Sequence, residues 1–160
     1  MAGKNRKKKF PDAIAVNRRA RFDYAIDETV ECGVVLVGTE VKSLRAGKAS
    51  IAQAFAVVRD GELWLYQAEI PEYSHGNRFN HDPQRQRKLL AHRAEVDRME
   101  KFTQQRGRTL VPLRLYFSDG KAKVLIGLGR GKALHDKRHD QAKADAQRDI
   151  DRALTARQRD

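Results

Sequence analysis

The stretch "TLVPLRLYFSDGKAKVLIGLG" (residues 109–129) reads as two β-strands joined by a tight turn. β-Branched, aromatic and leucine side chains fill both runs, and Ser118-Asp119-Gly120 lies between them. An Asp-Gly pair favours a hairpin, because glycine adopts a positive φ without a Cβ clash. Pro112 cannot donate a backbone hydrogen bond, which indicates an edge strand or a bulge near the start of the first run. The stretch therefore predicts an antiparallel pair of strands.

Two segments nearer the N-terminus also have strand character. "QAFAVVRDGELWLYQAEI" (53–70) repeats the pattern, with Asp60-Gly61 between two strand-like runs. "VECGVVLVGTEVKSLRAG" (30–47) is rich in β-branched residues, and apolar side chains occupy both parities. It predicts one long, curved barrel strand, with Gly33 and Gly38 permitting bends.

One principal helix is expected among these strands. Residues 71–86 carry Pro, Gly and Asn without a period and are read as a loop, whereas 87–105 has apolar residues at helical spacing and Gly107 placed to stop the helix. The stripe consists of Leu89, Leu90, Val96, Met99 and Phe102. With about five or six strands in all, the fold class is mainly β: a small antiparallel OB-type barrel with flanking helices. The strand order does not follow from the pattern.

Charge is unevenly distributed along the 160-residue chain. The net charge is +12, and half of that excess lies in residues 1–19. We therefore expect a basic flexible arm (1–13), an OB-fold core (14–129) and a C-terminal tail (130–160). Apolar residues are sparse in the tail, where a weak stripe steps by four residues, so the tail is expected to be disordered when free and helical only against a partner. The stripe is Ala142, Ala146, Ile150 and Leu154.

The composition also limits the partner and the compartment. A pI of about 10.1 favours a polyanion, either nucleic acid or an anionic membrane. The single cysteine, Cys32, excludes an intrachain disulfide and is read as a small apolar residue of a strand. No secretory signal follows the basic start, and no apolar run approaches the ~18 residues of a transmembrane helix. We expect a soluble, cytoplasmic protein.

Two motifs resemble those of enzymes, but each lacks a residue that the enzyme requires. "GLGRGKA" (127–133) resembles a phosphate loop, but Ala133 stands where Ser or Thr would bind magnesium. "HDKRH" (135–139) has the histidine spacing of a zinc protease, but Asp136 replaces the catalytic Glu and no third ligand is evident. His75 and His81 are read as solvated loop histidines. The sequence thus predicts neither an enzyme nor a cofactor or metal site.

A binding function remains. "NRRARFDY" (17–24) mixes arginines with Phe22 and Tyr24, which suits phosphate binding and base stacking. A basic edge strand with its aromatics in the core explains the same residues equally well. "RQRKLL" (85–90) supplies a second basic patch, at the expected start of the helix, where the helix dipole does not favour cations.

Taken together, five segments resemble the small protein B family, the SsrA-binding proteins of bacteria. They are "NRRARFDYAI" (17–26), "GTEVKSLRAGK" (38–48), "RKLL" (87–90), "TLVPLRLYF" (109–117) and "GKALHDKR" (131–138). The resemblance covers nearly all of 14–154. It implies an OB-type barrel that binds the tRNA-like domain of transfer-messenger RNA (tmRNA) and brings it to stalled ribosomes for trans-translation. It also implies a monomer on the RNA, whose tail occupies the decoding centre of the small-subunit rRNA and the empty mRNA channel.

The resemblance assigns residues to both RNA surfaces. Asn17, Tyr24 and Glu31 match positions associated with tmRNA, and we add Arg19, Lys42, Arg45 and Lys123 as phosphate contacts on physical grounds. The ribosomal role falls to Gly131, Lys132, His135, Asp136, Lys137 and Arg138, with Ile150 and Leu154 as apolar anchors. Two departures from the family are Ala133, where a second Lys is usual, and Ala91, where a third Leu is common.

Two other hypotheses stay open at this point. A general OB-fold RNA- or ribosome-binding protein without tmRNA specificity fits the composition equally well. A metal-dependent hydrolase would use His135 and His139, and it predicts stoichiometric zinc in the purified protein.

Overall fold

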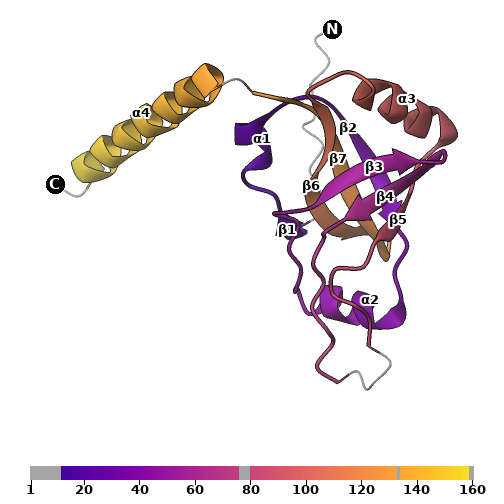
Figure 1. The fold of residues 1–160 in the computed structure, drawn as a ribbon. Coiled ribbons are helices and arrows are strands. Elements are labelled where there is room, and N and C mark those ends of the chain that lie inside the picture. The colour runs from indigo at the N-terminus through magenta and orange to yellow at the C-terminus, as the bar shows by residue number, and fades with distance from the viewer. Residues whose placement is uncertain (1–11, 76–79, 133, 159–160) are drawn as a thin grey trace, which may run out of the picture.

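The computed structural model describes residues 12–75, 80–132 and 134–158, without the side chains of 134–137, 140 and 158. Its elements, in chain order, are β1 (Ala13–Val16), α1 (Ala20–Asp23), β2 (Tyr24–Val34), α2 (Gly38–Arg45), β3 (Phe55–Arg59), β4 (Glu62–Tyr66), β5 (Arg87–Leu90), α3 (Arg93–Thr103), β6 (Arg108–Ser118), β7 (Lys121–Gly131) and α4 (Leu134–Gln158). Figure 1 shows α2 and α3 at different ends of the sheet, with α4 extending away from it.

The strands of the described residues form one antiparallel barrel. The sheet order is β1-β6-β3-β4-β5-β2-β7, and β7 pairs again with β6, so the sheet closes on itself with β1 attached outside the ring. Closure leaves few exposed strand edges. The expectation of a small antiparallel barrel with flanking helices is confirmed.

Both predicted hairpins are confirmed, and their turns have the expected backbone. β3 pairs with β4 around Asp60 and Gly61, whose φ values are 52° and 73°. β6 pairs with β7 around Asp119 and Gly120, with the same two φ values. The register of the second hairpin shifts between Pro112 and Arg114, so the proline marks a bulge, as the sequence predicted.

The prediction of one long strand over 30–47 is wrong. β2 ends at Val34, and Gly38–Arg45 forms the helix α2. The backbone N–H of Val37 donates to Oε1 of Glu40, which satisfies a group at the start of the helix. Lys42 and Arg45 therefore lie on a helix. The local sequence pattern did not predict this helix, because the residues that hold Glu40 in place, Arg85 and Arg87, are distant in the sequence.

The predicted helix over 87–105 begins six residues late. Arg87 and Leu89 are buried and Leu90 is exposed, which is the alternation of the strand β5. The helix α3 starts at Arg93, and Val96 and Met99 bury its apolar face as predicted. The "RQRKLL" segment is therefore not a basic patch at a helix start.

Two apolar clusters lie on opposite faces of the barrel wall, since neighbouring residues of β6 and β7 contribute to different clusters. The larger fills the interior and contains Cys32, which is fully buried, in agreement with its interpretation as a core residue. The smaller lies outside, beneath α1, and consists of Ala20, Val111, Leu113, Tyr116 and Leu125 with Tyr24 and Ile26 packed against it. In the described part of the chain, no helix combines the length and apolar character needed to cross a membrane.

Candidate nucleic-acid interface

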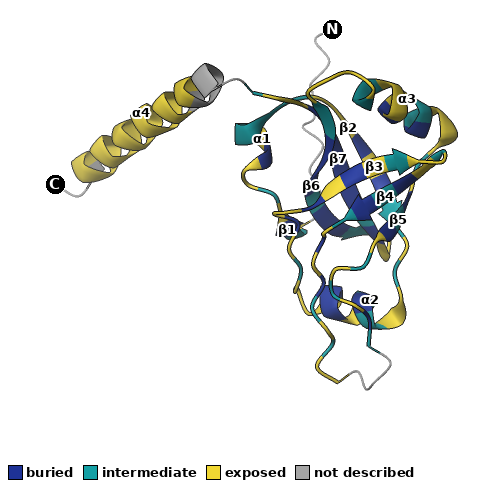
Figure 2. Cartoon of the chain, in the orientation of Figure 1, coloured by how far each residue is buried: buried dark blue, intermediate teal, exposed yellow. Residues whose placement is uncertain are grey.

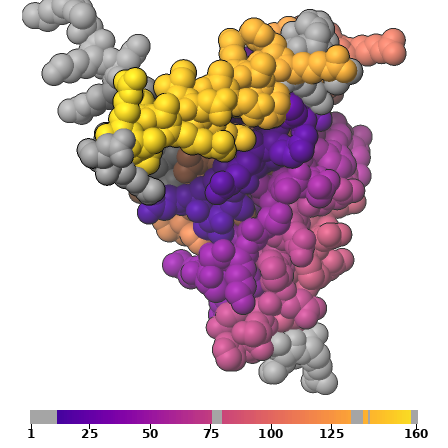
Figure 3. All heavy atoms as spheres, turned by 90° about the vertical axis from the view of Figure 1, so that its left-hand side faces the viewer, coloured from indigo at the N-terminus to yellow at the C-terminus, as the bar shows by residue number. Residues whose placement is uncertain are grey.

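A groove of about 430 Å³ separates the α1 region from the segment before β3. It gathers Asn17, Arg19 and Tyr24, three of the residues predicted from sequence to contact RNA. Its other lining residues are Ala20, Asp23, Ala52, Gln53, Ala54, Phe55, Thr109 and Val111. In Figure 3, which faces this side of the molecule, the indigo residues around α1 lie against the purple residues that follow in the chain.

Glycine in β7 makes room for Tyr24. A Cβ on Gly129 would lie 3.1 Å from Cβ of Tyr24 and 3.3 Å from Cδ1 of Ile26, closer than ordinary contacts. The absence of that Cβ lets both side chains of β2 lie on β7. The "GLGRG" run, which resembled a phosphate loop, therefore serves packing at the groove.

Arg19 remains available at the rim of the groove. Its side chain is 76% exposed, forms an ion pair of 3.6 Å with Asp23 and lies 5.4 Å from the centre of the Phe22 ring. An exposed ion pair of this kind contributes little to stability, so the guanidinium can turn to a phosphate at small cost.

Asn17 joins this groove to a second hollow of about 400 Å³. The backbone N–H of Asn17 donates to the carbonyl of Leu113, which fixes the chain between β1 and α1. Arg18, Arg21 and Arg114 line the second hollow. Arginines thus flank the groove, and they provide the positive charge that a phosphate backbone requires.

Glu31 and Lys123 lie together elsewhere, on the outer face of β2 and β7. Both line a shallow hollow of about 400 Å³ that also includes Ala91. Oε2 of Glu31 accepts a hydrogen bond from the hydroxyl of Tyr116, which is buried. Burial and this carboxylate raise the pKa of Tyr116, so the phenol stays protonated as a donor.

The two predicted cations of α2 form a third group. Nζ of Lys42 lies 5.6 Å from the centre of the Tyr73 ring, and the guanidinium of Arg45 lies 5.2 Å from that of Phe117. Figure 1 shows α2 at the end of the barrel away from α3, whereas α1 lies at its side. The predicted tmRNA residues are therefore divided among three surfaces.

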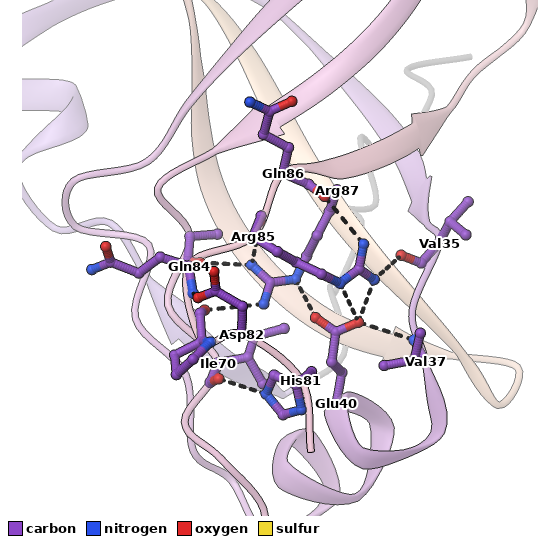
Figure 4. A network of polar contacts seen from close by, with 12 residues as sticks. Val35, Val37, Glu40, Ile70, His81, Asp82, Gln84, Arg85, Gln86 and Arg87 are labelled. Atoms are coloured by element: carbon purple, nitrogen blue, oxygen red, sulfur yellow. Dashed lines mark hydrogen bonds and ion pairs between the residues drawn. The ribbon is translucent and has the colours of Figure 1, made fainter. Parts of the chain in front are cut away.

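Sequence reasoning missed a buried ion pair that holds α2 against the barrel (Figure 4). Glu40 accepts a 2.5 Å hydrogen bond from Nε of Arg87, and both side chains are fully buried. Arg85 donates to the same carboxylate, with Nε at 3.1 Å. Burial alone would raise the pKa of Glu40, but the hydrogen bonds from Arg85, Val37 and Arg87 lower it below its usual value. The sequence did contain a signal for this ion pair: a Glu within "GTEVKSLR", and two arginines at alternate positions of "RQRKLL", as expected for side chains on one face of a strand.

The reading of His81 as a solvated loop histidine is wrong. Its side chain is buried, its Nε2 donates to the carbonyl of Ile70 at 2.8 Å, and its Nδ1 is hydrogen-bonded to the hydroxyl of Thr39 at 2.8 Å. His75 is exposed, as expected. His81 thus ties the loop after β4 to the first turn of α2.

The start of the tail is attached to α1. The backbone N–H of Lys132 donates to the carbonyl of Asp23 at 3.0 Å, and its Nζ donates to the carbonyl of Arg21 at 2.8 Å. The backbone N–H of Gly131 donates to the carbonyl of Gly107 at 2.9 Å. The point where the tail leaves β7 is therefore fixed beside the groove.

Beyond that point, α4 exposes its described side chains (Figure 2). Ile150 and Leu154, the predicted anchors, are each 54% exposed, and Arg138 is also exposed. The side chains of His135, Asp136 and Lys137, and residue 133, lie outside the described residues. Within the part of the chain that the structure describes, no three His, Cys, Asp or Glu residues gather as a metal site.

Comparison with known proteins gives one consistent result. The family model described as "SmpB protein" matches residues 14–156. An "SsrA-binding protein" from Thermobifida fusca is 56% identical over 92% of this chain and 92% of its own length. Another, from Bradyrhizobium sp. (strain ORS 278), is 51% identical over 98% of this chain and 99% of its own.

A solved structure agrees with this. It is described as "tmRNA-SmpB: a journey to the center of the bacterial ribosome", and it matches with a TM-score of 0.64 and 51% identity over 77% of this chain and 90% of that one. The motifs, the barrel and these relatives lead to the same conclusion: the chain belongs to the SmpB protein family.

Proposed function

We propose that this protein binds the tRNA-like domain of tmRNA and delivers it to stalled ribosomes for trans-translation. Sequence identity and one structural feature carry the proposal together. The chain is more than half identical to an SsrA-binding protein over 92% of its length, and its barrel gathers Asn17, Arg19 and Tyr24 around one groove. We place its activity in the cytoplasm, as a monomeric binding protein that uses no catalytic step.

The groove and the outer face of β2 would divide the contacts with tmRNA. Tyr24 would stack on a base, and Asn17 would hydrogen-bond a sugar or a base edge. Glu31 already accepts from Tyr116, so its second carboxylate oxygen would accept from a base amino group. Arg19, Lys42, Arg45 and Lys123 would neutralise phosphates on the three surfaces.

The tail would act on the ribosome. His135 would stack on a decoding-centre base and Lys137 and Arg138 would bind phosphates, with Asp136 orienting Arg138 or capping the helix. Gly131 and Lys132 would form the hinge. The exposed Ile150 and Leu154 would be the apolar anchors in the mRNA channel. Because α4 buries little of its own surface, we infer that the tail orders stably only where ribosomal RNA compensates the loss of entropy.

Binding to the isolated tRNA-like domain of tmRNA tests the proposal, with alanine tRNA as competitor at moderate salt. We expect a strong preference for the tmRNA domain. Equal binding of both RNAs, with a salt dependence that accounts for nearly all of the affinity, would instead identify a general RNA-binding barrel.

Removal of the tail tests whether the barrel and the tail have separate roles. A chain ending at Arg130 should keep its affinity for the tRNA-like domain and lose peptide tagging in a reconstituted stalled-ribosome assay. Loss of RNA binding in the shortened chain would contradict the separate roles of barrel and tail.

A further inference from the structure

The wall of the groove opposite α1 has no assigned role. Ala52, Gln53, Ala54 and Phe55 form it, facing the side that carries Asn17, Arg19 and Tyr24. A tyrosine and a phenylalanine therefore line one hollow from two segments about thirty residues apart in the sequence. An aromatic residue on each side of a narrow groove is an arrangement that suits a flat ring.

Phe55 is held as a platform. Its ring stacks on Tyr66 with the planes 6° apart and the centroids 5.4 Å apart, and the two residues are direct partners across β3 and β4. One face of the Phe55 ring is thus covered, while 37% of the residue stays exposed. The pairing of two strands fixes the ring, so little side-chain entropy is lost when a ligand stacks on it.

The groove also offers polar side chains that have no hydrogen-bond partner within the described part of the chain. Among the described residues, the side chains of Asn17, Gln53 and Thr109 make no hydrogen bond to other groups of the chain, and all three line the groove. Two amides and a hydroxyl supply both donors and acceptors. A ligand with a mixed hydrogen-bonding edge would satisfy them.

The charge around the groove selects the kind of ligand. Arg19 lies at its rim, and Arg18 and Arg21 line the adjoining hollow. Among the residues that line the groove itself, the acid is Asp23, which Arg19 neutralises at 3.6 Å. A flat apolar ring with a polar edge and an attached anion fits these features, and a nucleotide has all three.

We propose that this groove holds an unpaired nucleobase of the bound RNA, with Phe55 as its stacking platform and Gln53 and Thr109 reading its edge. The proposal deepens the tmRNA-binding function and rests on it. The volume of about 430 Å³ lies in the range of small-ligand pockets, ~300–1,000 Å³. A base inside a helical stem is stacked on both faces, so the groove selects a loop or bulge nucleotide.

Val57 provides a matched control. It lies two residues after Phe55 on the same outward face of β3, is 38% exposed and does not line the groove. Phe55→Ala in the full chain should weaken binding to the tRNA-like domain by about 5- to 150-fold, the worth of one base–aromatic stack. Val57→Ala should change it less than about twofold. Phe55→Leu, which keeps apolar packing on Tyr66 but has no π-face, should resemble Phe55→Ala.

A second experiment tests whether the groove binds unpaired bases in general, independently of tmRNA. Single-stranded RNA hexamers and a blunt duplex of the same length are titrated with the wild-type protein, Phe55→Ala and Gln53→Ala, after melting curves confirm that each variant is folded. We expect both variants to weaken binding of the hexamers and to leave that of the duplex unchanged.

The outcomes distinguish the two proposals. If the wild type prefers the tRNA-like domain and Phe55→Ala and Phe55→Leu bind it as the wild type does, the base pocket is refuted while the tmRNA function stands. If the wild type shows no preference for that domain, the tmRNA function fails. A loss on hexamers equal to the loss on duplex also overturns the pocket, because it indicates an effect on charge alone.

Discussion

Nε of Arg87 donates a 2.5 Å hydrogen bond to Glu40, and neither side chain is exposed to solvent. Arg87 also donates to the carbonyls of Ala68 and Pro83, so its guanidinium is satisfied on several sides. The pair joins α2 to β5 and to the loop before it. Two segments that carry the resemblance to the family, "GTEVKSLR" and "RKLL", are therefore linked by a structural contact.

Removal of one partner of this pair should destabilise the fold strongly. Glu40→Gln leaves the buried charge of Arg87 without its counter-ion, and we expect the free energy of unfolding to fall by about 3–5 kcal/mol. Chemical denaturation measures it. The control is Glu62→Gln, which breaks the exposed pair with Lys88 at 3.1 Å and should cost at most about 1 kcal/mol. Equal losses in the two variants would show that burial does not strengthen the Glu40 contact.

The stability of the protein should depend on this carboxylate at low pH. The folded-state pKa of Glu40 lies below its usual value of 4.5, so its contribution is complete above about pH 4.5 and is lost as the pH falls through the folded-state pKa. Melting temperatures between pH 6 and 3 should therefore fall more steeply for the wild type than for Glu40→Gln. Parallel curves would contradict the assignment.

A side chain at position 129 should destabilise the protein. Gly129→Ala places a Cβ 3.1 Å from Tyr24, and the required displacement should cost about 1–3 kcal/mol and weaken RNA binding. Gly38→Ala is the matched control, because its Cβ meets no atom within 4 Å at the start of α2. That variant should equal or exceed the wild type in stability, by up to about 1 kcal/mol. A neutral Gly129→Ala would mean that Tyr24 shifts freely.

The single cysteine should be unreactive in the folded protein. Burial, then the charges of Glu95 and Glu31, raise the pKa of Cys32 to about 12, so the thiolate is scarce at pH 8. Labelling by a thiol reagent should be slow in buffer and stoichiometric in denaturant. Rapid labelling of the native protein would reveal an opening of the barrel at β2.

Tyr24 should contribute one base stack to RNA binding. Tyr24→Ala is expected to cost about 1–3 kcal/mol in affinity for the tRNA-like domain, whereas Tyr24→Phe keeps the ring and should stay close to the wild type. Direct titration measures both, after melting curves have confirmed the fold. An unchanged dissociation constant for Tyr24→Ala would assign the residue to the outer apolar cluster alone.

Local chemistry made the hairpins predictable. Asp60-Gly61 and Asp119-Gly120 reach positive φ in the structure because glycine, and to a lesser degree aspartate, accept it. The bulge at Pro112 follows from the missing N–H of proline. The same reasoning failed for α2, since Gly38–Arg45 has little helical signal of its own and depends on Arg85 and Arg87, more than forty residues away.

The sequence by itself determined the barrel class, the two hairpins, the basic character and the family, because turn chemistry, period-two patterns and motif order are properties of neighbouring residues. The tertiary structure decided where β2 ends, why Arg87 is buried and which predicted RNA residues share a groove. The physical reason is that burial and ion pairing join residues distant in sequence. Neither the place of Phe55 opposite Tyr24 nor the attachment of Lys132 to α1 can be read from a linear pattern.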